Sequence, residues 1–168
     1  PLPNDDLDIQ ILWLIALEDK GLNLDCKDLG QYFNELMIFT HGEYGTAKTN
    51  LRAGLQPPVS GTHNNDFKDS CGSFIRAEIW ACLSPGHPEL AARYAFEDAV
   101  VDHGNGEGVY AEVFVAAMES ACFFETRVPT LIDIGLSYIP EDCAVSRAVR
   151  RAVACVEAGL DREQARQV

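Results

Sequence analysis

The sequence predicts an all-α domain. Apolar residues recur at helical spacing along most of its 168 residues, and the period-two alternation of a half-buried strand is hard to find over more than a few positions. The hydrophobic content of 47% allows a chain of this length to bury a substantial core without disulfides or a structural metal. No segment has the composition of a linker, so we expect residues 1–168 to form a single domain.

Start and stop signals place the individual helices. The first helix is expected to begin with Asn4 or Asp5 as N-cap and to end at Gly21. Pro88 and Pro140 suit the first turns of later helices, where the missing N–H is not needed. The stripe of the first helix expected to face the core is Leu7, Ile11, Leu14 and Ile15. The helices after it are expected at residues 28–39, 46–55, 72–83, 88–101, 108–125, 130–136 and 140–159.

Charge and cysteine content restrict the classes of function. With 13 basic and 26 acidic residues the net charge is −13, a field that repels a phosphate backbone, so no nucleic-acid partner is expected. The six cysteines form no C-x-x-C pair, and most lie in apolar helical patterns, which predicts buried thiols in a reducing compartment. No apolar run reaches membrane-spanning length, so we expect a cytoplasmic protein with no membrane partner.

The first candidate site is a cluster of oxygen ligands at the start of the first helix. Asn4, Asp5, Asp6 and Asp8 place an amide oxygen and three carboxylates within about one turn. Hard oxygen ligands at this density suit Mg²⁺, Mn²⁺ or Ca²⁺. The alternative is that the acids only complement the helix macrodipole.

The second candidate site is a glycine-rich turn between two helices. His103 ends one helix, and Gly104, Asn105, Gly106 and Gly108 lead into the next. Glycines let backbone N–H groups approach a ligand closely, and the N-terminus of the following helix favours a diphosphate. The alternative is an ordinary turn in which His103 interacts with the C-terminal carbonyls of its helix.

The third candidate site follows a long connection, residues 56–70, that is rich in Gly, Pro and Asn. Gly72 and Ser73 open the next helix and could let a ligand approach, with Arg76 one turn further on. Arg76 is expected to pair with a helix-terminal acid or to orient a loop. Glu112 lies one turn into the helix after the glycines, where it could reach a cleft, but the expected position is a solvated helix face.

In order along the chain, these three segments resemble motifs of the ADP-ribosylglycohydrolase family. Residues 4–7 are similar to the family's Thr-Asp-Asp-Thr motif, and residues 72–76 to its Gly-Ala-Ala-Met-Arg helix start. Residues 98–108, together with the helix at 112–118, resemble its substrate-loop region. The resemblance spans nearly the whole chain in the expected order.

The resemblance implies a compact orthogonal multi-helix bundle with two divalent cations, Mg²⁺ or Mn²⁺. The implied reaction is hydrolysis of the glycosidic bond that links ADP-ribose to a protein side chain or small acceptor. The implied metal ligands are Asn4, Asp5 and Asp6, with an amide oxygen in place of a threonine hydroxyl. The implied substrate-binding residues are His103, Gly104, Asn105, Gly106, Gly108, Gly72 and Ser73. No general acid or base is assigned.

The sequence also departs from the family pattern. The family opens with a Gly-Asp-Ala-Leu-Gly type segment and closes with a Gly-Gly-Asp-Thr-Asp type segment whose acids complete the metal pair, and neither occurs here. We therefore expect the middle part of a longer domain, with weak metal affinity and little turnover by itself. The first alternative is a non-catalytic domain that binds ADP-ribose or a related nucleotide, and the second is a helical interaction module without a small ligand.

Overall fold

The computed structural model describes residues 4–167, and in that range the chain contains helices and turns but no strand, which confirms the all-α prediction. Two of the segments are single short turns of helix, and one, η1, is a 3₁₀-helix. The helices are α1 (Asp5–Lys20), α2 (Cys26–Leu36), α3 (Gly42–Arg52), α4 (Val59–Thr62), η1 (Phe74–Arg76), α5 (Glu78–Leu83), α6 (Pro88–Ala99), α7 (Glu107–Ala121), α8 (Val128–Leu136), α9 (Ala144–Glu157) and α10 (Arg162–Ala165).

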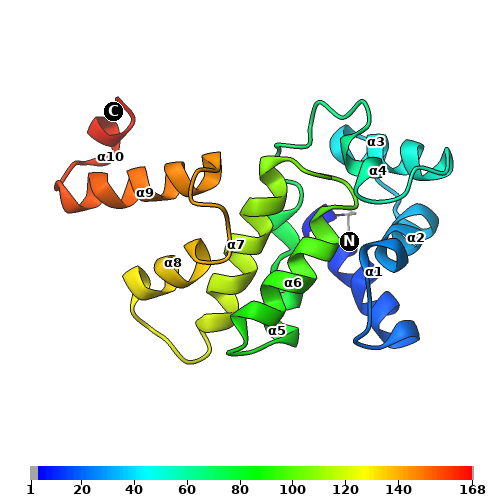
Figure 1. Ribbon diagram of the computed structural model, residues 1–168, viewed down its shortest axis with the longest axis horizontal. Helices are drawn as coiled ribbons and strands as arrows, with labels where there is room; N and C mark the ends of the chain where they lie inside the picture. The colour runs from blue at the N-terminus through cyan, green and yellow to red at the C-terminus, as the bar shows by residue number, and fades with distance from the viewer. Residues whose placement is uncertain (1–3, 168) are drawn as a thin grey trace.

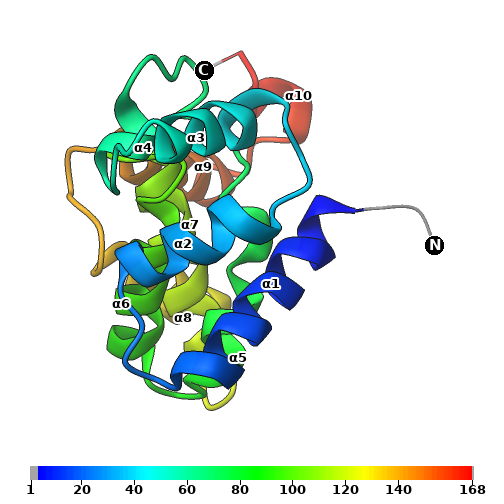
Figure 2. The same cartoon turned by 90° about the vertical axis from the view of Figure 1, so that its right-hand side faces the viewer.

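Helix α7 lies at the centre of the fold (Figure 1). It packs against α5, α6, η1, α8 and α9, and its apolar residues are buried on most of its circumference. A helix that is apolar nearly all round belongs in an interior. Helices α1 to α4 lie together on one side of α6 and α7, whereas α9 and α10 extend away from the opposite side (Figures 1 and 2).

A row of aromatic rings forms the core between α1–α2 and α5–α6. The centroid of Trp13 lies 6.3 Å from that of Phe33 and 6.5 Å from that of Trp80, and Trp80 lies 5.5 Å from Tyr94. All four side chains are nearly or fully buried. Because aromatic side chains bury large apolar areas, this row links the first two helices to the centre of the bundle.

The predicted ends of α1 are confirmed. Asn4 is the N-cap, and its Oδ1 accepts a hydrogen bond from the backbone N–H of Leu7 at 3.2 Å. The chain leaves the helix at Gly21 with φ 74°, a conformation that glycine adopts without a steric penalty. Pro88 is likewise in the first turn of α6, as predicted.

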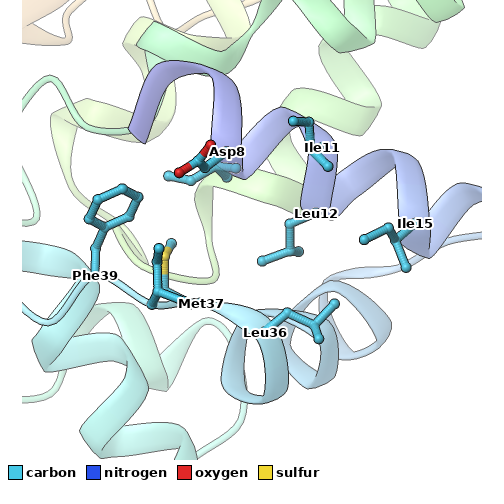
Figure 3. A pocket seen from close by; sticks show the side chains of 9 residues that line it. Asp8, Ile11, Leu12, Ile15, Leu36, Met37 and Phe39 are labelled. Atoms are coloured by element: carbon cyan, nitrogen blue, oxygen red, sulfur yellow. The ribbon is translucent and has the colours of Figure 1, made fainter. Parts of the chain in front are cut away.

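The predicted inward stripe of α1 is wrong. Leu7, Ile11, Leu14 and Ile15 are 62%, 54%, 52% and 39% exposed. Because α1 is apolar on both faces, its periodicity fits two stripes, and the one that carries Trp13 faces the core. The buried residues of α1 are Ile9, Leu12, Trp13 and Ala16. The outer face borders an apolar groove of about 200 Å³ between α1 and the segment after α2, and Figure 3 shows Ile11, Ile15, Leu36 and Phe39 around it.

Two other helix predictions are corrected. The segment 72–83 is not one helix, because η1 ends at Arg76 and α5 begins at Glu78. Helix α9 does not begin at Pro140: it begins at Ala144, where the carboxylate of Glu107 accepts the N–H of Ala144 at 2.9 Å and that of the next residue at 3.0 Å. The Sγ of the N-cap residue Cys143 accepts the N–H of Ser146 at 3.3 Å, so a local cap and a distant acid together define this helix start.

The prediction of buried thiols is only partly right. All six cysteines are free, so no disulfide framework is present. Cys143 and Cys155 are buried and Cys26 is partly buried, but Cys71, Cys82 and Cys122 are exposed. An apolar helical pattern therefore did not fix which face each thiol occupies. No helix within residues 4–167 combines the length and apolar character needed to cross a membrane.

Candidate functional site

A fully buried arginine joins segments that are far apart in the sequence. Arg76 donates through Nε and one terminal nitrogen to Asp98 Oδ1, at 3.0 and 2.7 Å. It also donates to both oxygens of Asp102, at 2.9 and 2.8 Å, and to the carbonyl of Gly72 at 2.9 Å. These acceptors use the whole donor fork of the guanidinium, the condition under which a buried ion pair is tolerated.

The opposite charges of this network stabilise one another in their ionised forms. Burial would lower the pKa of Arg76, but Asp102 and Asp98 raise it well above its usual value. Burial would raise the pKa of Asp102, but Arg76 and His103 hold it well below its usual range. Asp98 Oδ2 also accepts the indole N–H of Trp80 at 2.8 Å. The site is thereby tied to the aromatic row of the core.

A third acid, Glu112, lies beside this network and is fully buried, which corrects the prediction of a solvated face. Neither of its carboxyl oxygens has a hydrogen-bond partner in the described part of the chain. Burial first, and the nearby charge of Asp98 second, raise the pKa of Glu112 well above its usual value. The raised pKa favours the neutral, protonated form of Glu112 beside the ion pairs of Arg76.

His103 is held at both ring nitrogens. Its Nδ1 lies 2.8 Å from Asp102 Oδ1, and its Nε2 lies 3.3 Å from the hydroxyl of Ser70. In the neutral tautomer with the proton on Nδ1, the ring donates to Asp102 and accepts from Ser70. The ring also lies against Gly108, where an added Cβ would be 2.2 Å from His103 Cδ2.

Tyr44 of α3 connects the start of α1 to the same network. Its hydroxyl lies 3.3 Å from Asp5 Oδ2 and 3.1 Å from the carbonyl of Gly72, which also accepts from Arg76. Burial raises the pKa of Tyr44, so the hydroxyl stays protonated and acts as a donor. The three segments singled out in the sequence therefore converge on one region.

The chain was compared with models of known protein families. The family model for ADP-ribosylglycohydrolase matches residues 2–168. The chain belongs to the ADP-ribosylglycohydrolase family. This confirms the resemblance found in the motifs, and the all-α fold agrees with it. No curated protein and no solved structure matches the chain.

The residues that the family motif assigns to metal binding have separate local roles. Asn4 caps α1, Asp5 accepts from Tyr44, and the exposed Asp6 side chain has no partner among the described residues. Carboxylates that have no basic partner are chemically suitable ligands for a hard cation. Within residues 4–167, no three His, Cys, Asp or Glu side chains come together in a group that could hold a metal ion.

The predicted substrate-binding residues are brought together, but most are buried. Ser73 donates to the carbonyl of Gly108 at 2.8 Å, which joins the start of η1 to the turn after His103. Asn105 is the exposed member of that turn. With Gly104 it lines a pocket of about 310 Å³, together with Cys26, Pro58, Phe96, Glu97, Val100, Val109 and Tyr110.

The N-terminus of α7, predicted to favour a diphosphate, already faces a carboxylate. Asp69 Oδ1 accepts the backbone N–H of Glu107 at 2.7 Å, and this hydrogen bond holds the pKa of Asp69 below its usual value. Gly106 allows the close approach, since an added Cβ would lie 2.1 Å from the carbonyl oxygen of Lys68. The loop before Gly72 is thus held against the glycine-rich turn.

Sequence reasoning missed Glu43, Tyr44, Asp69 and Ser70. Each acts through a contact with a segment that is distant in the sequence, and no motif or spacing marks these residues. Glu112 did carry a signal, because it is the one acid in the apolar run 109–118 of a central helix. A lone acid in such a run indicates a buried group.

The contact between His103 and Gly108 gives a direct test. Gly108→Ala would stabilise an ordinary helix, but here the methyl group meets a ring fixed at both nitrogens. We expect the free energy of unfolding to fall by about 1–3 kcal/mol, as for overpacked cores, measured by urea denaturation. In a His103→Ala background the same change should cost nothing. An equal cost in both backgrounds would show that the ring is not the obstacle.

Proposed function

We propose that this chain contributes to a metal-dependent hydrolase that cleaves the glycosidic bond between ADP-ribose and a protein side chain or small acceptor. The convergence of the three family motifs on one connected region supports this function. The partner would be an ADP-ribosylated protein or a small ADP-ribosyl conjugate. The free thiols suit a reducing, cytoplasmic compartment.

Asp5 and Asp6 would hold Mg²⁺ or Mn²⁺, with the amide oxygen of Asn4 as a further donor. A bound cation would supply Lewis-acid chemistry to a water and to the ribose hydroxyls. Tyr44 orients the carboxylate of Asp5 by donating toward Oδ2. This contact leaves the other carboxylate oxygen of Asp5 available as a ligand.

The buried network would position the substrate side of the site. Arg76 fixes the carbonyl of Gly72, and Asp102 fixes the ring of His103. His103 holds the hydroxyl of Ser70, so the loop before Gly72 keeps its place beside the glycine-rich turn. Asn105, exposed on that turn, offers an amide to the ADP-ribosyl group. No residue is assigned as general acid or base.

The test is binding and turnover in variants of the first motif. We expect Mn²⁺ and ADP-ribose together to raise the melting temperature of the wild-type chain by mass action. The double variant Asp5→Asn, Asp6→Asn should lose the Mn²⁺-dependent part of this rise. The same double variant should also release ADP-ribose more slowly from ADP-ribosylated arginine and serine peptides, measured in Mn²⁺.

The matched control is Glu18→Gln with Glu35→Gln, which removes two exposed acids from α1 and α2. It should keep the wild-type response to Mn²⁺. An unchanged response in the Asp5, Asp6 double variant would refute the metal role. Stabilisation by ADP-ribose without release from either peptide would favour the non-catalytic binding alternative.

A further inference from the structure

The outer face of α1 carries a row of exposed apolar side chains. Leu7, Ile11 and Leu14 follow one another at helical spacing, and each is more than half exposed. Beside this row, Ile15 helps to line the groove between α1 and the segment after α2. Single exposed apolar side chains are ordinary on a protein surface, but a contiguous row of them marks an interaction surface.

The opposite wall of the groove is apolar as well. Leu36 and Ile38 line it and are 43% and 63% exposed, and the side chain of Phe39 closes one end. Figure 3 shows the side chains of Leu36 and Phe39 across the groove from α1. The groove, of about 200 Å³, therefore offers apolar side chains of a partner two walls to contact.

The rim of this apolar surface is acidic. Asp8 lines the groove, the exposed Glu18 lies in the last turn of α1 on the face of the apolar row, and the exposed Glu35 adjoins the opposite wall. No lysine or arginine of the described chain lines the groove. The basic residue of α1, Lys20, pairs with Asp28 of α2 at 3.3 Å. The surface thus combines apolar contact with negative charge.

This combination selects between occupants. Opposite charges across an interface favour one partner, and like charges placed together exclude others. Helix α1 of a second copy would bring its own acids against the same acidic rim, so pairing of two α1 faces is disfavoured. An apolar row at spacings of four and three residues, as from Leu7 to Ile11 and Leu14, matches the anchor pattern of a second amphipathic helix.

We propose that the groove and the outer face of α1 bind an amphipathic helix of a partner protein, whose apolar face is flanked by lysine or arginine. The surface from Leu7 to Glu18 extends over about 17 Å, at about 1.5 Å per residue, so a partner helix of about three turns covers it. Its apolar side chains enter the groove, and its basic side chains lie beside Asp8, Glu18 and Glu35. This interaction is independent of the proposed hydrolase function.

The test measures binding of two synthetic helical peptides to the full chain by fluorescence anisotropy. One is an amphipathic helix of leucine and lysine, and the other has glutamate in place of every lysine. We expect the first to bind and the second not to bind. The double variant Ile11→Ser, Leu36→Ser should raise the Kd of the leucine–lysine peptide by about 10-fold or more, because apolar contacts at the centre of an interface carry most of its binding energy.

The matched control is Val128→Ser with Val156→Ser, which changes two apolar side chains, 62% and 76% exposed, on α8 and α9. It should leave the Kd unchanged. Neither double variant alters the charge of the protein, so general attraction of a basic peptide to an acidic chain is the same in both. If Ile11→Ser, Leu36→Ser misfolds, Glu18→Gln with Glu35→Gln provides the second measurement, and it should raise the Kd most at low salt.

Equal affinity for both peptides, or an unchanged Kd in the folded Ile11→Ser, Leu36→Ser variant, would overturn the proposal. Sedimentation velocity of the wild-type chain gives a further check. Self-association that the same double variant abolishes would also overturn the proposal, because the occupant of the groove would then be a second copy of this chain.

Discussion

Replacing Arg76 by methionine is expected to lower the free energy of unfolding by about 3–5 kcal/mol, the cost of removing one partner from a buried ion pair. The change leaves Asp98 and Asp102 buried without their cation and the carbonyl of Gly72 without one of its donors. A loss of this size is a large share of the stability of a typical domain. Urea denaturation followed by far-ultraviolet circular dichroism measures it.

Arg127→Met is the matched control. The side chain of Arg127 is 75% exposed, and its nearest nitrogen lies 3.6 Å from a carboxylate oxygen of Glu125. An exposed pair of this kind contributes at most about 1 kcal/mol. Arg76→Lys keeps the charge but loses the planar fork of hydrogen-bond donors. Its free energy of unfolding should therefore lie between those of the Arg76→Met and Arg127→Met variants. Equal stabilities of the Arg76→Met and Arg127→Met variants would mean that the network does not hold the fold together.

The second large effect is expected from Glu112→Gln, and it depends on pH. The pKa of Glu112 is raised in the folded protein above its ordinary value of 4.5, so the folded state binds more protons than the unfolded state. The stability of the wild-type protein therefore falls as the pH rises from that value through the folded pKa. Each unit of pKa elevation corresponds to about 1.4 kcal/mol. The glutamine variant does not ionise and should escape this loss.

We thus expect Glu112→Gln to match the wild-type stability near about pH 4 and to exceed it increasingly toward about pH 9, as linkage requires. Urea denaturation across this range is the measurement. Glu157→Gln, which changes an exposed acid on α9, should show no such trend. A constant difference between Glu112→Gln and the wild type at every pH would contradict a protonated Glu112.

The fold was predictable where a local signal decides it. Asn4, Gly21 and Pro88 mark helix ends through hydrogen-bonding capacity or backbone geometry, and these signals act within one turn. The direction in which α1 faces was not predictable, because both of its faces are apolar and only the contact of Trp13 with Phe33 and Trp80 selects one. The start of α9 was missed for a similar reason, since the distant side chain of Glu107 adds two hydrogen bonds there beside the N-cap Cys143.

The candidate site was predictable as a set of segments but not as a set of contacts. The motifs identified Asp5, Gly72 and His103, which do lie in one connected region. Their connection depends on Arg76, which was expected to pair with a helix-terminal acid and does so with Asp98 near the end of α6. It also depends on Tyr44 and Ser70, whose hydroxyl groups have no distinctive spacing in the sequence. Hydrogen bonds between segments far apart in the chain leave no periodic trace, and they emerge only with the tertiary structure.

Glu107 links the start of α9 to the loop that borders the site. Its backbone N–H is bound by Asp69, while its side chain supplies the first two hydrogen bonds of α9. Helices α9 and α10 project from the bundle, and α9 packs mainly on α7 (Figure 1). Local opening draws on elements with few buried contacts. The C-terminal arm, α9 and α10, therefore depends on few contacts with the centre, among them the two hydrogen bonds from Glu107, whereas the loop that borders the site is also held by the contact between Ser70 and His103.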